Sequence, residues 1–135
     1  MKRVMSPVFL AMLFLFFLGA GTFGQAVKPP KITGTYSNMS YIREAGDVIG
    51  YEIKIVFTGG RFQGALQIAE GVPGDLILVD IEAKGSSITF AIPDGNPYAG
   101  RFSGAVENGW LKGKFSFKLG GEETVALRRG KSYWD

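Results

Sequence analysis

Polar side chains that could do chemistry are densest in residues 41–47, next to the first predicted turn. Glu44 and Asp47 could form a pair of acids or supply carboxylate ligands to a calcium ion. The alternative is a solvated hairpin, in which Asp47 bonds its own backbone and Arg43 pairs with a carboxylate. Turns of this composition are common, so we favour the hairpin and keep Arg43, Glu44 and Asp47 as candidate contact residues.

A second polar group, Gln67 and Glu70, precedes a Val-Pro-Gly turn at residues 72–74. Glu70 is predicted to share a strand face with apolar residues, so it could orient a ligand at the end of the fold or simply reach water, and we favour water. Further along, Asp94 and Asn96 offer oxygens at alternate positions but lack the remaining ligands of a calcium loop, which indicates a turn.

The chain ends on adjacent aromatic residues, Tyr133 and Trp134, after the cations Arg128, Arg129 and Lys131. Two aromatic side chains at a chain end are costly to leave in water. They either cover one end of the fold as a plug or present an aromatic and cationic surface to a partner. We favour the plug.

The composition excludes several kinds of catalysis. The chain contains no cysteine and no histidine, which rules out disulfides, thiolate metal sites and catalytic triads built on histidine. An enzyme of this composition would need two carboxylates facing each other, as in glycoside hydrolysis. Glu70 is the only acid that we predict on the inner face of a strand, so we predict no catalytic residue, no metal site and no cofactor.

These side chains must be positioned by β-strands, because apolar and polar residues alternate along most of the chain after residue 30. Ile53 and Ile55, for example, oppose Lys54, with Val56 as an apolar exception on the polar face. Turn signals recur at intervals of roughly 12 residues and separate eight such segments. Nothing after the N-terminal region has helical periodicity of comparable strength.

Eight short antiparallel strands in an up-and-down meander leave two exposed edges unless the last strand pairs with the first. We therefore predict an all-β fold, an eight-stranded closed barrel of the lipocalin or avidin kind, with an open two-sheet sandwich as the alternative. The interior of such a barrel is either filled by side chains or holds one small ligand.

The segment GRFQGALQ at residues 60–67 returns as GRFSGAVE at residues 100–107. In both copies the phenylalanine and the second glycine are predicted to point inward. A glycine inside a strand marks a bend or a close approach, and a neighbouring aromatic can cover the gap. The alternative is that the glycines hollow a cavity for an apolar molecule. Several other inward phenylalanines would fill the lumen, so we interpret the repeat as part of the scaffold.

The N-terminus has the order of a signal peptide, with Lys2 and Arg3 before an apolar run and small residues ending at Ala26. We predict removal of residues 1–26 and a single barrel domain over residues 27–135. These 109 residues carry 13 basic and 12 acidic side chains, so we predict no nucleic-acid partner. We expect the protein to be secreted or periplasmic, with no stable membrane anchor after cleavage.

The segment ITGTYSN at residues 32–38 resembles the opening strand of the avidin and streptavidin family, whose barrels bind biotin. The resemblance places Tyr36 where an aromatic is expected and Asn38 at a ligand contact. That family cages biotin with several tryptophans, whereas this chain has two, Trp110 and Trp134. The resemblance supports a barrel and does not support biotin.

A broader resemblance is to small secreted bacterial proteins of unassigned function. It rests on Glu-Ala-Gly-Asp at residues 44–47, on QIAEGVPG at 67–74 and on Ser-Tyr-Trp at 132–134. It implies an exported bacterial β-protein.

The function that we predict is an exported, non-catalytic barrel that acts as an interaction or binding module in the periplasm or outside the cell, with an unknown protein or a small apolar ligand as its partner. The alternative is a carrier of one small apolar ligand in the lumen, and the third possibility is an enzyme that uses carboxylates. The candidate contact residues are Tyr36, Asn38, Arg43, Glu44, Asp47, Gln67, Glu70, Tyr133 and Trp134.

Overall fold

The structure is a computed structural model that describes residues 31–135, so the predicted signal peptide at 1–26 lies outside the described residues. All regular structure in the described part is β-strand. The strands are β1 (Gly34–Ser37), β2 (Ser40–Ile42), β3 (Asp47–Thr58), β4 (Arg61–Pro73), β5 (Ile77–Lys84), β6 (Ser87–Ile92), β7 (Gly100–Glu107), β8 (Trp110–Phe117) and β9 (Glu122–Gly130).

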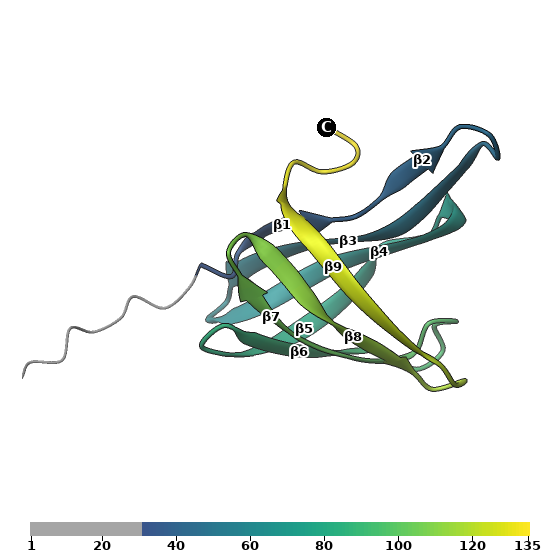
Figure 1. Cartoon of the computed structure of the whole chain (residues 1–135). Coiled ribbons are helices and arrows are strands. Elements are labelled where there is room, and N and C mark those ends of the chain that lie inside the picture. Colours follow the sequence, from purple (N-terminus) through teal and green to yellow (C-terminus); the bar gives the residue numbers. More distant parts are fainter. Residues whose placement is uncertain (1–30) are drawn as a thin grey trace, which may run out of the picture.

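Consecutive strands from β3 to β9 pair antiparallel, and β9 returns to pair with β1, which also pairs with β3 (Figure 1). This ring of eight strands, with β2 as one extra strand, is a closed up-and-down barrel. The predicted closed barrel is confirmed, and the sandwich is set aside. Within residues 31–135 we find no helix long and apolar enough to cross a membrane.

The first predicted strand is broken into β1 and β2 at Asn38 and Met39. The Asn38 backbone N–H donates to the Tyr51 carbonyl at 3.0 Å, and the Asn38 side-chain oxygen accepts from the Tyr51 N–H at 2.7 Å. This close approach needs Gly50 opposite, because a Cβ there would lie 2.7 Å from that same oxygen. Gly50 also adopts a φ of 114°, which glycine tolerates best. β3 and its neighbours therefore bend here.

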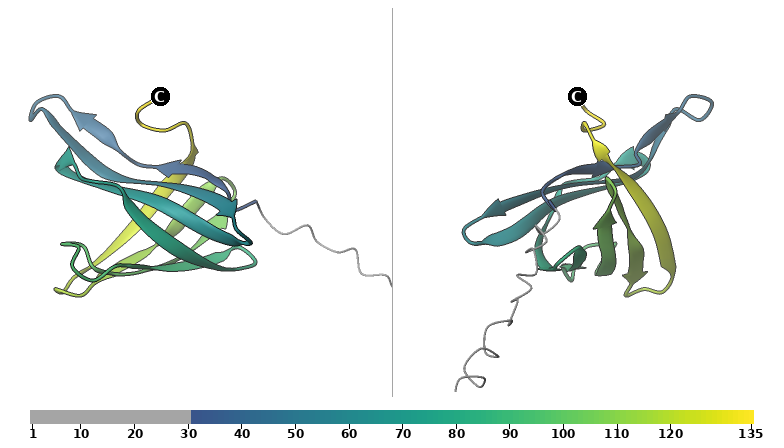
Figure 2. Two further views of the ribbon diagram at one scale, coloured as in Figure 1. Left: turned by 180° about the vertical axis from the view of Figure 1, so that it is seen from behind. Right: turned by 60° about the vertical axis from the view of Figure 1, so that its left-hand side comes forward.

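The β3–β4 hairpin is longer than the barrel is tall. β3 pairs with β4 from Val48 to Thr58, whereas β5 pairs with β4 only between Phe62 and Leu66. The remaining part of β4, the start of β3 and β2 form an arm that projects from the barrel, as the tip of the β2–β3 turn shows in all views (Figures 1 and 2).

The barrel lumen is filled by the apolar residues that the alternation assigned to the inner face. A ladder of rings runs across it: Tyr51 stacks on Phe115 at 4.8 Å between ring centroids, Phe115 contacts Phe102 at 4.9 Å, and Phe102 stacks on Phe90 at 4.9 Å. Aliphatic side chains surround this ladder and are almost completely buried. Such contacts supply most of the free energy of folding in a domain of this size.

Both copies of the repeat begin a strand, β4 and β7, and their glycines face the lumen as predicted. Gly104 lies directly across from Gly113 on β8, and the Phe102 ring covers the pair. A Cβ would lie 2.8 Å from the Phe102 Cζ atom at Gly104 and 2.5 Å from it at Gly113. In the other copy, the space at Gly64 is filled by Ile53, Ile81 and Val79.

Candidate functional site

Two predicted contact residues serve the scaffold. Tyr36 has no exposed surface, and its hydroxyl donates to the Ile32 carbonyl at 2.7 Å and accepts from the Arg129 guanidinium at 2.5 Å. The Asn38 side chain is held by the Tyr51 backbone. The Tyr36 hydroxyl and the Asn38 side-chain oxygen are therefore engaged within the fold. The interpretation of the two residues as ligand contacts, which for Asn38 follows from the avidin resemblance, stays a prediction.

The predicted group lies at the tip of the arm: Arg43 and Glu44 are in the turn between β2 and β3, and Asp47 begins β3, paired with Ile42. The turn is closed by backbone hydrogen bonds from Ala45 and Gly46 to the Ile42 carbonyl. The predicted pairing of Arg43 with a carboxylate is not among the ion pairs of the described residues. Within the described part, no three acidic side chains come close enough to hold a metal ion.

Glu70 lies at one barrel mouth, where it accepts a hydrogen bond from the Tyr98 hydroxyl at 3.0 Å. A second acid lies at the same mouth: Glu123 accepts a hydrogen bond from the Tyr51 hydroxyl. The prediction that Glu70 is the only inward acid is therefore wrong. β9 begins at Glu122, and Glu123 pairs with the inward Phe115, so Glu123 shares the inner face.

The two tyrosines of this mouth are held in their protonated form. Burial raises the pKa of Tyr51 above its ordinary value of 10.0, and the Glu123 and Glu70 carboxylates raise it further. The pKa of Tyr98 is also raised by burial and by its hydrogen bond to Glu70. Each hydroxyl therefore acts as a donor, and the two acids are anchored by neutral phenols rather than by cations.

The C-terminal tail does not plug a barrel mouth, which corrects the prediction that we favoured. The Ser132 hydroxyl donates to Glu52 at 2.6 Å, and the Tyr133 backbone N–H donates to the same carboxylate at 2.7 Å. Glu52 faces outward from β3, between inward Tyr51 and Ile53, and the tail covers it until only 8% is exposed. The chain end accordingly lies outside the barrel wall (Figures 1 and 2).

The tail is held at a second point by Gln67, a predicted contact residue on the outer face of β4. The Trp134 indole N–H donates to the Gln67 amide oxygen at 2.9 Å, and the Gln67 amide nitrogen donates to the Gly74 carbonyl at 2.8 Å. Trp134 remains 58% exposed. Gln67, Tyr133 and Trp134 therefore belong to one surface, on the outer face of β3 and β4.

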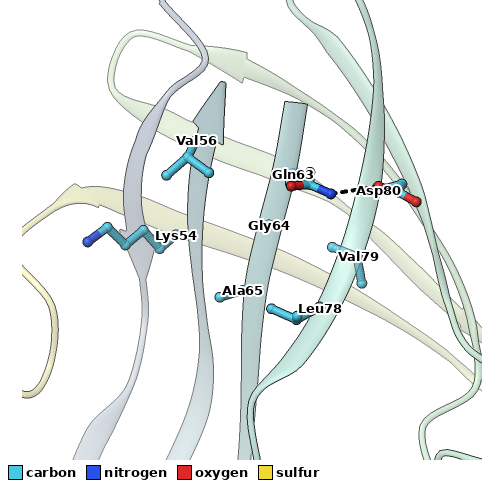
Figure 3. Close-up of a pocket in the computed structure, with 8 residues that line it drawn as sticks. All are labelled: Lys54, Val56, Gln63, Gly64, Ala65, Leu78, Val79 and Asp80. Atoms are coloured by element: carbon cyan, nitrogen blue, oxygen red, sulfur yellow. Dashed lines mark hydrogen bonds between the residues drawn. The ribbon is translucent and has the colours of Figure 1, made fainter. Parts of the chain in front are cut away.

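The same outer face continues into a depression of about 270 Å³ on β3, β4 and β5 (Figure 3). Its apolar lining comes from Val56 on β3, Ala65 on β4, and Leu78 and Val79 on β5. The polar lining includes Lys54 and Asp80, which carry opposite charges. The register places Lys54 beside Ala65 and Ala65 beside Leu78, so these side chains form a row across three strands.

Several apolar side chains of this outer face are exposed to solvent. Leu78 is 76% exposed, and Val56, Leu76 and Trp134 are exposed as well. A strand on the wet side of a barrel ordinarily presents polar residues there. We call Val56, Ala65, Leu76, Leu78 and Trp134 the outer-wall patch. Val56, Ala65 and Leu78 lie on the outer side of three adjacent strands, Leu76 precedes β5, and Trp134 belongs to the docked tail.

Sequence reasoning identified the tail and Gln67 but missed Glu52, Leu76 and Leu78. The alternation did carry one signal, since Val56 stood out as an apolar residue on a polar face. Leu78 on β5, two strands further along the sheet, is likewise an apolar residue on the polar face. Glu52 had no local signal, because its partners are 80 and 81 residues further along the chain.

Comparisons with protein-family models, with curated proteins and with solved structures find no match to this chain. The two resemblances drawn from short segments stay predictions. Function is therefore inferred from the geometry of the barrel and its surface.

Proposed function

We propose that this protein is an exported interaction module that binds another protein through the outer-wall patch. The observation that carries the proposal is the contrast between the two faces of β3–β5. The inner face is packed against the aromatic ladder, while the outer face exposes Leu78 and Val56 at a depression, and Leu76 is exposed two residues before Leu78. Exposed apolar patches with a polar rim are typical of protein interaction sites.

The patch has the parts of a protein-binding surface. Trp134 offers a large, half-exposed ring whose indole N–H is already fixed by Gln67, so little rotamer freedom remains to be lost on binding. The depression beside Ala65 can receive an apolar side chain of a partner. Lys54 and Asp80 flank it with opposite charges, which favours a partner that carries a complementary pair.

The carrier alternative needs an internal cavity of at least ~300 Å³. What supports the outer wall over the lumen is that Tyr51 on β3 stacks on Phe115 on β8 across the barrel, and Phe102 and Phe90 on the next two strands continue the row of rings. The enzyme alternative would use Glu70 and Glu123, and no further observation favours it.

The repeat supplies a matched pair of variants to test the proposal. Ala65 lies in the outer-wall patch, and Ala105 is its equivalent in the second copy, on the outer face of β7. Ala65→Glu places a charge in the depression, whereas Ala105→Glu adds the same charge outside it. We expect a protein from the exported fraction of the source to be retained by immobilised native chain and by Ala105→Glu, and lost with Ala65→Glu.

Thermal unfolding of the three forms, followed by circular dichroism, checks that both variants fold. Equal retention by all three would contradict the proposal. A native mass spectrum that shows a small molecule bound to the chain would favour the carrier instead. The proposal predicts a bare mass, or the mass of a protein complex.

A further inference from the structure

A second depression lies between the first strand, the end of β9 and the docked tail. It measures about 410 Å³ and opens to solvent. Ser37 and Met39 line one side, Arg128 and Lys131 another, and Tyr133 forms the tail side. The lining residues lie outside the outer-wall patch, although Tyr133 belongs to the same docked tail as Trp134. The inference does not rest on the proposed function.

The lining is cationic, and the carboxylate beside it, Glu52, is paired with Ser37 across the strands and bonds the tail. Arg128, Arg129 and Lys131 all line the depression, and no aspartate or glutamate does. The ion pairs within residues 31–135 engage Arg61, Lys114 and Lys118, and none of the three lining cations. Arg128 and Lys131 therefore offer two positive charges to one concave surface, whereas the Arg129 guanidinium points to the other face of β9, against Tyr36.

The hydrogen-bond partners of the Arg129 guanidinium are all neutral groups. The guanidinium donates to the carbonyls of Lys31 and Thr33 and to the Tyr36 hydroxyl, and lies 5.1 Å from the centre of the Tyr36 ring. Its buried Nε atom has no hydrogen-bond partner among the described residues. A cation that is fixed by neutral dipoles raises the positive potential of the surface around it, and a concave wall concentrates that field.

Hydroxyl groups complete the donor set. The Ser37 oxygen accepts from the Met39 N–H at 3.2 Å, which leaves its own O–H free to donate to a ligand. The Tyr133 side of the depression exists only while the tail is docked.

The two carboxylates next to the tail are engaged in holding it. Glu52 accepts from the Ser132 hydroxyl and the Tyr133 N–H, on the outer face of β3. Asp135 accepts from the Ser132 backbone N–H at 3.2 Å. Neither acid lines the depression, so neither forms an ion pair with Arg128 or Lys131 there.

We propose that this depression binds a phosphate group. Guanidinium and ammonium groups together with hydroxyl donors suit a tetrahedral oxyanion, because arginine forks bond two of its oxygens and lysine adds a point charge. The phosphate can come from a soluble phosphate compound or from a lipid headgroup.

The test uses the full-length chain expressed for export and purified in its exported form. Inorganic phosphate and pyrophosphate are titrated at low salt and followed by calorimetry. We expect saturable binding that the Arg128→Gln/Lys131→Gln double variant weakens at least about tenfold, the usual effect of losing charge-assisted hydrogen bonds. A matched control, Lys84→Gln/Lys112→Gln, removes the same charge outside the depression and should stay within about twofold of the native chain.

A third variant, Glu52→Gln, loosens the tail without touching the lining cations, and we expect it to weaken binding by a smaller factor. Equal weakening by the two double variants would show a general charge effect and overturn the proposal. The lipid source is tested with phosphatidylglycerol vesicles against phosphatidylcholine vesicles. Binding to the anionic vesicles that only the Arg128→Gln/Lys131→Gln variant loses, without binding of free phosphate, identifies the headgroup. Absence of binding to both probes overturns the proposal.

Discussion

The two copies of the repeat start from the same five residues and end in different surroundings. The copy on β7 lies wholly within the barrel, where Phe102 is completely buried against Gly104 and Gly113. The copy on β4 begins directly after the β3–β4 turn, at the end of that hairpin. Phe62 is partly exposed there and packs edge-on, at 4.9 Å, against Phe57, which is itself 58% exposed.

This difference separates what a local motif specifies from what its neighbours add. In both copies the glycine faces inward, because the alternation sets the face. What fills the space above the glycine differs: a ring from the same strand on β7, and aliphatic side-chain ends from three neighbouring residues on β4. The motif is therefore one building rule with two packing solutions, and only at Gly104 would a Cβ meet backbone atoms.

The largest expected effect comes from valine at the two glycines. At Gly104 a Cβ would meet the backbone at the Lys112 carbonyl and Gly113 Cα, which cannot move without breaking the β7–β8 pairing. We expect Gly104→Val to lower the free energy of unfolding by more than ~3 kcal/mol or to prevent folding. Gly64→Val meets flexible side-chain ends and should cost ~1–3 kcal/mol. Urea unfolding measures both.

Equal losses of unfolding free energy in Gly104→Val and Gly64→Val would contradict the difference between the two copies of the repeat. A variant at either glycine that folds normally but loses a binding activity would overturn the scaffold interpretation of the repeat.

A smaller effect is expected from the two phenylalanines. Phe102→Ala removes a fully buried ring at the centre of the aromatic ladder and should cost ~3–5 kcal/mol. Phe62→Ala removes a ring that is already partly in water, so we expect ~1–2 kcal/mol. The measurement is again the midpoint and slope of urea unfolding. A loss at Phe62 as large as that at Phe102 would show that the β4 copy is part of the same rigid core.

The smallest effect is the pH dependence of the free energy of unfolding that comes from Tyr51 at the barrel mouth. Because the pKa of Tyr51 is raised above 10.0 in the folded protein, its stabilising contribution is complete below pH 10 and is lost as the pH rises further. We expect the free energy of unfolding to fall between pH 10 and pH 12, and to fall less in Tyr51→Phe. Phe117→Leu, a nearby change without a titrating group, should keep the native pH profile.

Much of the fold could be predicted from the sequence, because it follows from the two faces of each strand and from the two edges of the sheet. The alternation around Ile53 and Ile55 assigns the inner face, and closure follows from the cost of two free edges. The break at Asn38 could not be predicted, since it depends on Gly50 lying directly opposite. Of the candidate site, the tail and Gln67 were found, but the tail was assigned to the wrong place because its anchor, Glu52, resembles any other outward glutamate.

The sequence by itself determined the alternation that sets the two faces of each strand, how many strands close the barrel and which catalytic groups the chain lacks, because these depend on side-chain type and on a period of two residues. Only the tertiary structure decided which distant residues meet. Ala65 lies beside Leu78, Glu123 meets Tyr51, and Glu52 holds Ser132. Such contacts depend on strand register and on closure of the barrel, which bring together residues that no local pattern relates.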